Sequence, residues 1–151
     1  MRNPMKIATS IVVLCGWLVA EGKGLPLKDL PAVVQKTVQD NLMGGVIKNI
    51  GKEKEDGIVQ YEIETMRNGS ARDFHVDTKG NLLLVEEATT IDAIPSAAKA
   101  SILKKIADGK LLTVETHTKT GLPTKYEATY QDRMGKKHEV LVKADGVETK
   151  E

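Results

Sequence analysis

The chain has 151 residues, of which 28% are charged and 40% are hydrophobic, proportions typical of a folded domain rather than a disordered segment. Its 22 Lys and Arg residues nearly balance its 21 Asp and Glu residues, and the resulting net charge of +1 provides no basic field for binding nucleic acid. The single cysteine, Cys15, excludes a disulfide scaffold and a thiolate metal site.

The N-terminus has the pattern of a secretory signal peptide. Arg2 and Lys6 precede an uncharged run over residues 7–20 (IATSIVVLCGWLVA). At about 1.5 Å per residue, this run is too short to cross the hydrocarbon core of a bilayer as a helix. Small residues follow, and cleavage after Gly22 fits, as does cleavage a few positions to either side. We therefore expect residues 1–22 to be removed, leaving a periplasmic or secreted protein with no attachment to the membrane.

Residues 25–88 resemble residues 89–151, which predicts a duplicated unit. The match includes the helical period, the glycines and the strand alternation, with small shifts in the loops. A single unit would be only marginally stable, so we expect the two units to associate closely. The matched pairs include Pro31 and Pro95, Val34 and Ala98, Gly45 and Gly109, Tyr61 and Tyr126, and Gly80 and Gly146.

Each unit begins with a predicted amphipathic helix of about 13 residues, because apolar residues recur at every fourth position. Asp29 and Asp92 precede these helices as candidate N-caps. Gly44-Gly45 and Gly109 follow them as candidate left-handed stops. The apolar positions are Leu30, Val34, Val38 and Leu42 in the first unit, and Ile94, Ala98, Ile102 and Ile106 in the second.

After each helix the hydrophobic period changes to two, which predicts antiparallel strands joined by tight turns. Together these patterns predict an α+β fold of two α-β-β-β(-β) repeats, with the helices on one face of an antiparallel sheet. The repeats form either one continuous sheet or two packed sheets. The predicted turns of the first unit are Asp56-Gly57, Asn68-Gly69 and Lys79-Gly80, and a short polar strand after Gly146 ends the second unit.

The chain contains a series of short motifs: Leu30-Pro31-Ala32, Gly44-Gly45, Asp56-Gly57, Tyr61-Glu62-Ile63 and Val76-Asp77-Thr78-Lys79-Gly80. Together they resemble the PepSY domain, and more closely the exported bacterial tandem PepSY-like proteins, whose architecture is similar to beta-lactamase inhibitory protein. The resemblance covers both repeats and implies a non-catalytic module with an inhibitory or protein-binding role. No catalytic residues carry over from the family. The second copy departs from the pattern, with Ser96 in place of Ala32 and Pro123 before its Tyr-Glu strand.

Asp73, His75 and Asp77 are spaced by two residues, so on a strand they share one face. Their oxygen and imidazole groups are ligands for a divalent metal. The simpler interpretation, which we favour, is the solvated polar side of a half-buried sheet, and we expect no resident cofactor. His117 and His138 have no matching carboxylate spacing and are interpreted as ordinary surface or satisfied histidines.

The sequence contains no Gly-x-Ser-x-Gly elbow, no His-Glu-x-x-His motif and no phosphate-binding Gly-rich loop. We therefore expect a non-enzymatic, exported protein-binding module. Its partner is unidentified, an exported enzyme being one candidate and an inhibitor-like action one form of the interaction. The alternatives are a cell-envelope protein that binds a small ligand or a divalent metal, and a sheet face that is merely solvated.

The side of the sheet away from the helices is the candidate partner-binding face. Its central residues are Gln60, Glu62, Glu64, Asp73, His75, Asp77, Lys125, Glu127 and Thr129. The strand alternation extends this face to Leu83, Val85, Glu139, Leu141 and Lys143.

Overall fold

The computed structural model describes residues 24–55 and 57–150, so the signal peptide predicted over 1–22 lies outside the described residues. A 3-10 turn at Leu27–Asp29 precedes two helices, α1 (Ala32–Asn41) and α2 (Ser96–Ile106). No helix in the described part is long and apolar enough to cross a membrane. The strands are β1 (Val46–Glu55), β2 (Ile58–Arg67), β3 (Ser70–Asp77), β4 (Leu82–Thr89), β5 (Lys110–Lys119), β6 (Lys125–Gln131), β7 (Lys137–Lys143) and β8 (Glu148–Thr149).

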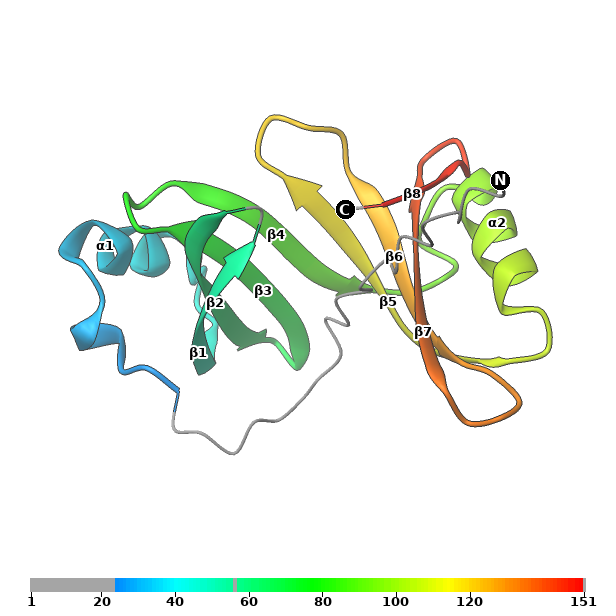
Figure 1. Cartoon of the computed structure of the whole chain (residues 1–151), viewed down its shortest axis with the longest axis horizontal. Helices are drawn as coiled ribbons and strands as arrows, with labels where there is room; N and C mark the ends of the chain where they lie inside the picture. The colour runs from blue at the N-terminus through cyan, green and yellow to red at the C-terminus, as the bar shows by residue number, and fades with distance from the viewer. Residues whose placement is uncertain (1–23, 56, 151) are drawn as a thin grey trace, which may run out of the picture.

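These strands form a single eight-stranded antiparallel sheet in which each strand pairs with the next along the chain. The pairing of β4 with β5 joins the two halves of the sheet, with Val85 opposite Thr118 and Thr89 opposite Val114. The fold is therefore α+β with one continuous sheet, rather than two packed sheets (Figure 1).

Both helices pack on the same face of the sheet, at its opposite ends (Figure 1). Val85 packs on the core below α1, and Thr89 on the same side of β4 lies opposite Val114, which belongs to the core below α2. The core below α1 comprises Leu30, Val34, Val38, Ile50, Tyr61, Ile63, Phe74 and Val76. The core below α2 comprises Ile94, Ala98, Ile102, Ile106, Val114, Ala128, Tyr130, Val140 and Val142.

The helices begin differently from the sequence prediction. Asp29 lies in the 3-10 turn and Asp92 lies in a turn before α2, so neither residue is an N-cap. The N-cap positions belong to Pro31 and Pro95, which make no side-chain capping hydrogen bond. Proline suits the start of a helix because its fixed φ is compatible with the first turn.

Both helices are followed by a non-glycine residue of positive φ, Met43 at +48° after α1 and Ala107 after α2, but only α1 also has a glycine in that conformation. After α1, Gly44 has a φ of +82°, as the prediction of a left-handed stop requires. After α2 the residue with positive φ is Ala107, at +51°, so the prediction for Gly109 is wrong. Gly109 is needed for close packing instead, because an added Cβ would lie 2.6 Å from the carbonyl oxygen of Gln131.

Two glycines in the strand connections fit tightly against the helices. Gly80 has a φ of +85°, and an added Cβ would lie 2.9 Å from the carbonyl oxygen of Val33 on α1. Gly146 has a φ of +83°, and its added Cβ would lie 2.6 Å from the carbonyl oxygen of Ala97 on α2. Each position therefore needs glycine twice over, for its backbone conformation and for the close approach of a helix.

We expect Gly80→Ala and Gly146→Ala each to lower the free energy of unfolding by about 2 to 4 kcal/mol, as measured by urea denaturation. Gly121→Ala is the matched control, because its φ is +79° but nothing lies within 4 Å of an added Cβ. The control should lose only about 1 kcal/mol of unfolding free energy, the cost of placing alanine in a left-handed backbone conformation. Equal losses at all three positions would show that helix packing does not constrain these turns.

Candidate functional site: the open face of the sheet

The face of the sheet opposite the two helices, called the open face below, carries the alternate side chains of β1–β7. Tyr61 and Phe74 point into the core below α1, so their sequence neighbours point away from it. By the strand registers, the open face holds all of the residues predicted for partner binding: Gln60, Glu62, Glu64, Asp73, His75, Asp77, Lys125, Glu127 and Thr129.

The predicted phase of β4 is wrong. We expected Leu83 and Val85 on the open face, but Val85 packs against the core below α1. A β-bulge between His75 and Val76 shifts the pairing of β3 with β4, so that Leu84 lies opposite His75 on the open face. One extra residue in a ladder exchanges the inward and outward sides of the strand beyond it.

Carboxyl groups cross the open face in a row, called the acidic strip below. Asp73 lies directly opposite Glu86, and Glu115 lies directly opposite Glu127. Like charges opposed across antiparallel strands repel each other, so this arrangement opposes folding rather than supporting it. The acidic strip takes one residue from each of β2–β7: Glu62, Asp73, Glu86, Glu115, Glu127 and Glu139.

The environment of the strip raises the pKa values of three of its members. Burial, followed by repulsion from four neighbouring carboxylates, raises the pKa of Glu62 from 4.5 to about 7. Burial and then carboxylate repulsion likewise raise the pKa of Glu115 to about 7. Burial raises the pKa of Asp73 to about 6, against the lowering effect of the hydrogen bond from the Thr65 N–H. The strip is thus only partly ionised near neutral pH, and a cation docked on it would favour full ionisation.

Asp73, His75 and Asp77, the alternative metal trio of the sequence analysis, share the open face, but their polar atoms have different partners. Asp73 Oδ1 accepts the backbone N–H of Thr65 at 2.9 Å. The Asp77 carboxylate accepts backbone N–H groups of the turn that follows β3. His75 Nδ1 lies beside side chains of β1 and β2. The three side chains therefore belong to separate sets of contacts.

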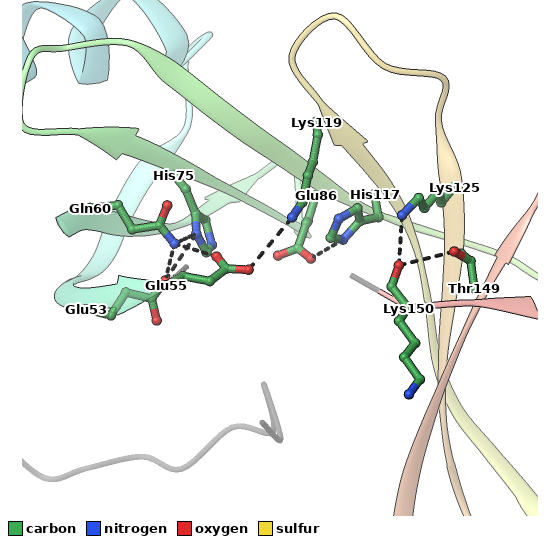
Figure 2. Close-up of polar contacts among 10 residues, drawn as sticks. All are labelled: Glu53, Glu55, Gln60, His75, Glu86, His117, Lys119, Lys125, Thr149 and Lys150. Atoms are coloured by element: carbon green, nitrogen blue, oxygen red, sulfur yellow. Dashed lines mark hydrogen bonds and ion pairs between the residues drawn. The ribbon is translucent and has the colours of Figure 1, made fainter. Parts of the chain in front are cut away.

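Two other groups on the open face each bring one histidine together with two glutamates. Within each group, the potential metal-binding atoms lie within 4.8 Å of one another. Both imidazoles are buried, and in both the Nε2 atom has no hydrogen-bond partner among the described residues. Figure 2 shows His75 beside Glu53 and Glu55, and His117 beside Glu86. The groups are Glu53, Glu55 and His75, and Glu86, His117 and Glu127.

Sequence reasoning overlooked Glu53, Glu55 and Glu86, and it left His117 as an ordinary histidine. A signal for the first two was present, because the charge alternates along residues 52–55 with the period of a strand. That alternation places both glutamates on one face and both lysines on the other. Glu86 gave no comparable signal, since its side of the sheet depends on the bulge between β3 and β4.

The aromatic residues of the described part of the chain lie on the helix side of the sheet. Tyr61, Phe74 and Tyr130 belong to the two cores, and Tyr126 packs against the core below α2. The open face consequently offers none of the large aromatic anchors on which tight apolar interfaces depend. Recognition by this face would depend mainly on charge.

Several solved structures share this fold, although no protein-family profile and no curated protein matches the sequence. A DUF2874 family protein from Bacteroides uniformis superposes with a TM-score of 0.65 at 14% identity, over 80% of this chain and 86% of that one. A BLIP-like protein from Bacteroides fragilis gives 0.60 at 18% identity, over 83% and 85%. A Bacteroides eggerthii protein named for an expected periplasmic location gives 0.66 at 14% identity, over 80% and 86%.

These identities are low, so the likeness establishes the fold alone. The chain has a BLIP-like fold, as the resemblance to beta-lactamase inhibitory protein implied. Membership of the PepSY family stays a prediction.

Proposed function

We propose that the protein is an exported, non-enzymatic protein-binding module that recognises a cationic surface of its partner through the acidic strip. The observation that carries the proposal is the row of carboxyl groups across six neighbouring strands. Burial, and then repulsion between neighbouring carboxylates, raises the pKa values of Glu62, Asp73 and Glu115, so keeping these groups ionised reduces the stability of the fold. A positively charged partner would relieve this repulsion, and the free energy recovered would contribute to binding.

The open face holds five of the six carboxyl groups of the strip partly exposed, whereas Glu127 is buried. Each strand is hydrogen-bonded to its neighbours, and two helices support the far side of the sheet (Figure 1). A preformed surface loses little conformational entropy on binding, which offsets the lack of aromatic anchors. The interaction we propose is therefore electrostatic, fast to form and sensitive to salt.

Export is supported by the signal-peptide pattern over residues 1–22 and by the structural neighbour named for an expected periplasmic location. An exported enzyme is the partner class that the BLIP-like fold suggests, and binding that covers its active site would make the protein an inhibitor. The absence of recognisable catalytic motifs in the sequence fits a module that acts by binding.

The two-repeat interpretation, including its PepSY-like character, also belongs to this proposal. In chain order, a helix followed by four strands occurs twice. Gly80 approaches the carbonyl oxygen of Val33, and Gly146 approaches that of Ala97, so sequence-matched glycines contact sequence-matched helix positions. This correspondence supports duplication, and under it the acidic strip draws on both copies.

The test is an affinity capture from an exported-protein fraction, with quantitative binding of whichever partner is retained. The strip variant carries Glu62→Gln, Asp73→Asn and Glu115→Gln. Its matched control carries Asp40→Asn, Asp92→Asn and Glu148→Gln, which remove the same number of carboxyl groups from other surfaces. We expect the strip variant to bind at least about tenfold more weakly, or about 1.4 kcal/mol, and the control to bind as the wild type does.

Salt and pH provide the second measurement. Affinity should fall as ionic strength rises, and it should increase from pH 6 to pH 8 because Glu62 and Glu115, with pKa values of about 7, ionise over that range. A partner held equally well by the wild type and the strip variant, or one insensitive to salt, would refute recognition through the acidic strip.

A further inference from the structure

We infer a divalent-metal site at one end of the open face, formed by Glu53 and Glu55 on β1, Gln60 on β2 and His75 on β3. It goes beyond the protein-binding role and does not depend on it. The ligand set is also different from the Asp73, His75 and Asp77 trio, of which it retains only the histidine.

The four side chains converge on one point (Figure 2). The Gln60 amide nitrogen lies 2.8 Å from Glu53 Oε1, 2.8 Å from Glu55 Oε2 and 3.1 Å from His75 Nδ1. An amide nitrogen has only two hydrogens, so it cannot donate to three acceptors at once. Its two hydrogens are matched by the two glutamate oxygens, and His75 Nδ1 also lies 3.2 Å from Glu53 Oε1, within reach of a hydrogen bond of its own. Two carboxylate oxygens and one imidazole nitrogen thus line a single point, and together they form a donor set suited to a cation.

The spacing of the ligand atoms fits an ion of the size of zinc. His75 Nδ1 lies 3.2 Å from Glu53 Oε1. Two ligands about 2.1 Å from a tetrahedral zinc ion lie about 3.4 Å apart, so this pair is close to the required separation. A half-turn of the Gln60 amide would bring its oxygen to the same point as a fourth ligand, and oxygen and nitrogen are distinguished only by the hydrogen bonds they make.

Burial and charge favour an ion over the present hydrogen bonds. The His75 side chain is 5% exposed, whereas that of Glu53 is 37% exposed, so the imidazole forms the floor of the site and the carboxylates form its mouth. Two carboxylates provide the charge that neutralises a divalent ion. The cation now paired with Glu55 is the Lys119 ammonium, at 3.8 Å, a weak contact that an ion would readily displace.

The donor atoms also indicate the kind of metal. One imidazole nitrogen with carboxylate and amide oxygens suits Zn²⁺ and similar transition-metal ions, whereas Ca²⁺ and Mg²⁺ prefer oxygen ligands alone. We favour this group over the second histidine group because the Gln60 amide also converges on it.

The test is a calorimetric titration of the purified protein with Zn²⁺, alongside thermal unfolding with and without the ion. We expect Zn²⁺ to raise the Tm, and Glu53→Gln and His75→Gln each to weaken binding at least tenfold. Glu64→Gln is the matched control: it removes the same charge from the same face but lies outside the site, so it should bind within twofold of the wild type. Ca²⁺ should bind more weakly than Zn²⁺.

The buried His75 could matter for folding, so Glu53→Gln, at a partly exposed position, decides the outcome if His75→Gln fails to fold. The inference is overturned if Zn²⁺ produces neither heat nor a rise in Tm. It is also overturned if Glu53→Gln retains the wild-type affinity, or if His117→Gln abolishes binding while Glu53→Gln does not. None of these results bears on the acidic strip, whose variants leave all four ligands in place.

Discussion

Phe74→Ala should destabilise the protein more than any other substitution proposed here, by about 3 to 5 kcal/mol. The ring is fully buried at the centre of the core below α1, and the Arg72 guanidinium lies over it, 5.5 Å from the ring centroid. Truncation would remove the buried apolar area of the ring and leave a cavity in its place. The Arg72 guanidinium would also lose its contact with the face of the ring. For a domain of this size the Tm should fall by about 10 to 20 °C.

The form of the transition matters as much as its position. β4 and β5 join the two cores through a continuous ladder of hydrogen bonds. Destabilising the first core should therefore lower the unfolding temperature of the whole sheet. Calorimetry of Phe74→Ala should therefore show one shifted transition, and Ile102→Ala in the other core should shift the same transition. Met134→Ala, at a residue that is 90% exposed, is the control and should change the Tm little. A transition that splits, with half the heat unshifted, would mean that the two halves unfold independently.

The elements were predictable from sequence because their patterns are local. Val34 and Val38 recur with the helical period, and Phe74 and Val76 alternate with the strand period, so both the elements and their buried sides followed. The helix ends were less predictable. Aspartate and proline are both favourable near the start of a helix, and glycine is favourable near its end. Tertiary contacts determine which of these residues takes the capping position. Gly109 shows this, since it avoids the carbonyl of Gln131 rather than ending α2.

The open face was predictable in outline but its groups were not. Alternation alone placed Glu62 and Asp73 on it. The convergence of Glu53 with His75 depends instead on the registers of β1 with β2 and of β2 with β3, which no local pattern fixes. The bulge between β3 and β4 then turned Glu86 outward, where it joins the acidic strip. Sites assembled across strands thus depend on register, which the sequence specifies only through packing.

The acidic strip should make the protein more stable in mild acid than at alkaline pH. Glu62 and Glu115 have pKa values of about 7 and Asp73 one of about 6 when folded, above their ordinary values of 4.5 and 3.8. The folded state thus holds protons more tightly than the unfolded state. Its stability is therefore greatest below the unfolded pKa values and declines as the pH rises to about 7. Between pH 5 and pH 8 we expect a loss of about 2 to 4 kcal/mol, less than the separate shifts would sum to because the groups are coupled.

Urea unfolding at several pH values measures this effect, and one variant assigns it to the strip. Glu62→Gln removes one repelling charge, so it should be more stable than the wild type at pH 8, by about 1 to 2 kcal/mol, and should lose less stability between pH 5 and pH 8. Asp40→Asn, an exposed carboxylate on α1 paired with Lys36, should keep the wild-type slope. Asp77 and Asp132, whose hydrogen bonds lower their pKa values, lose their stabilising effect only in stronger acid, outside this range. If Glu62→Gln kept the full wild-type slope, the carboxyl groups of the strip would not be coupled through the fold, and the electrostatic relief that a cationic partner is proposed to provide would not exist.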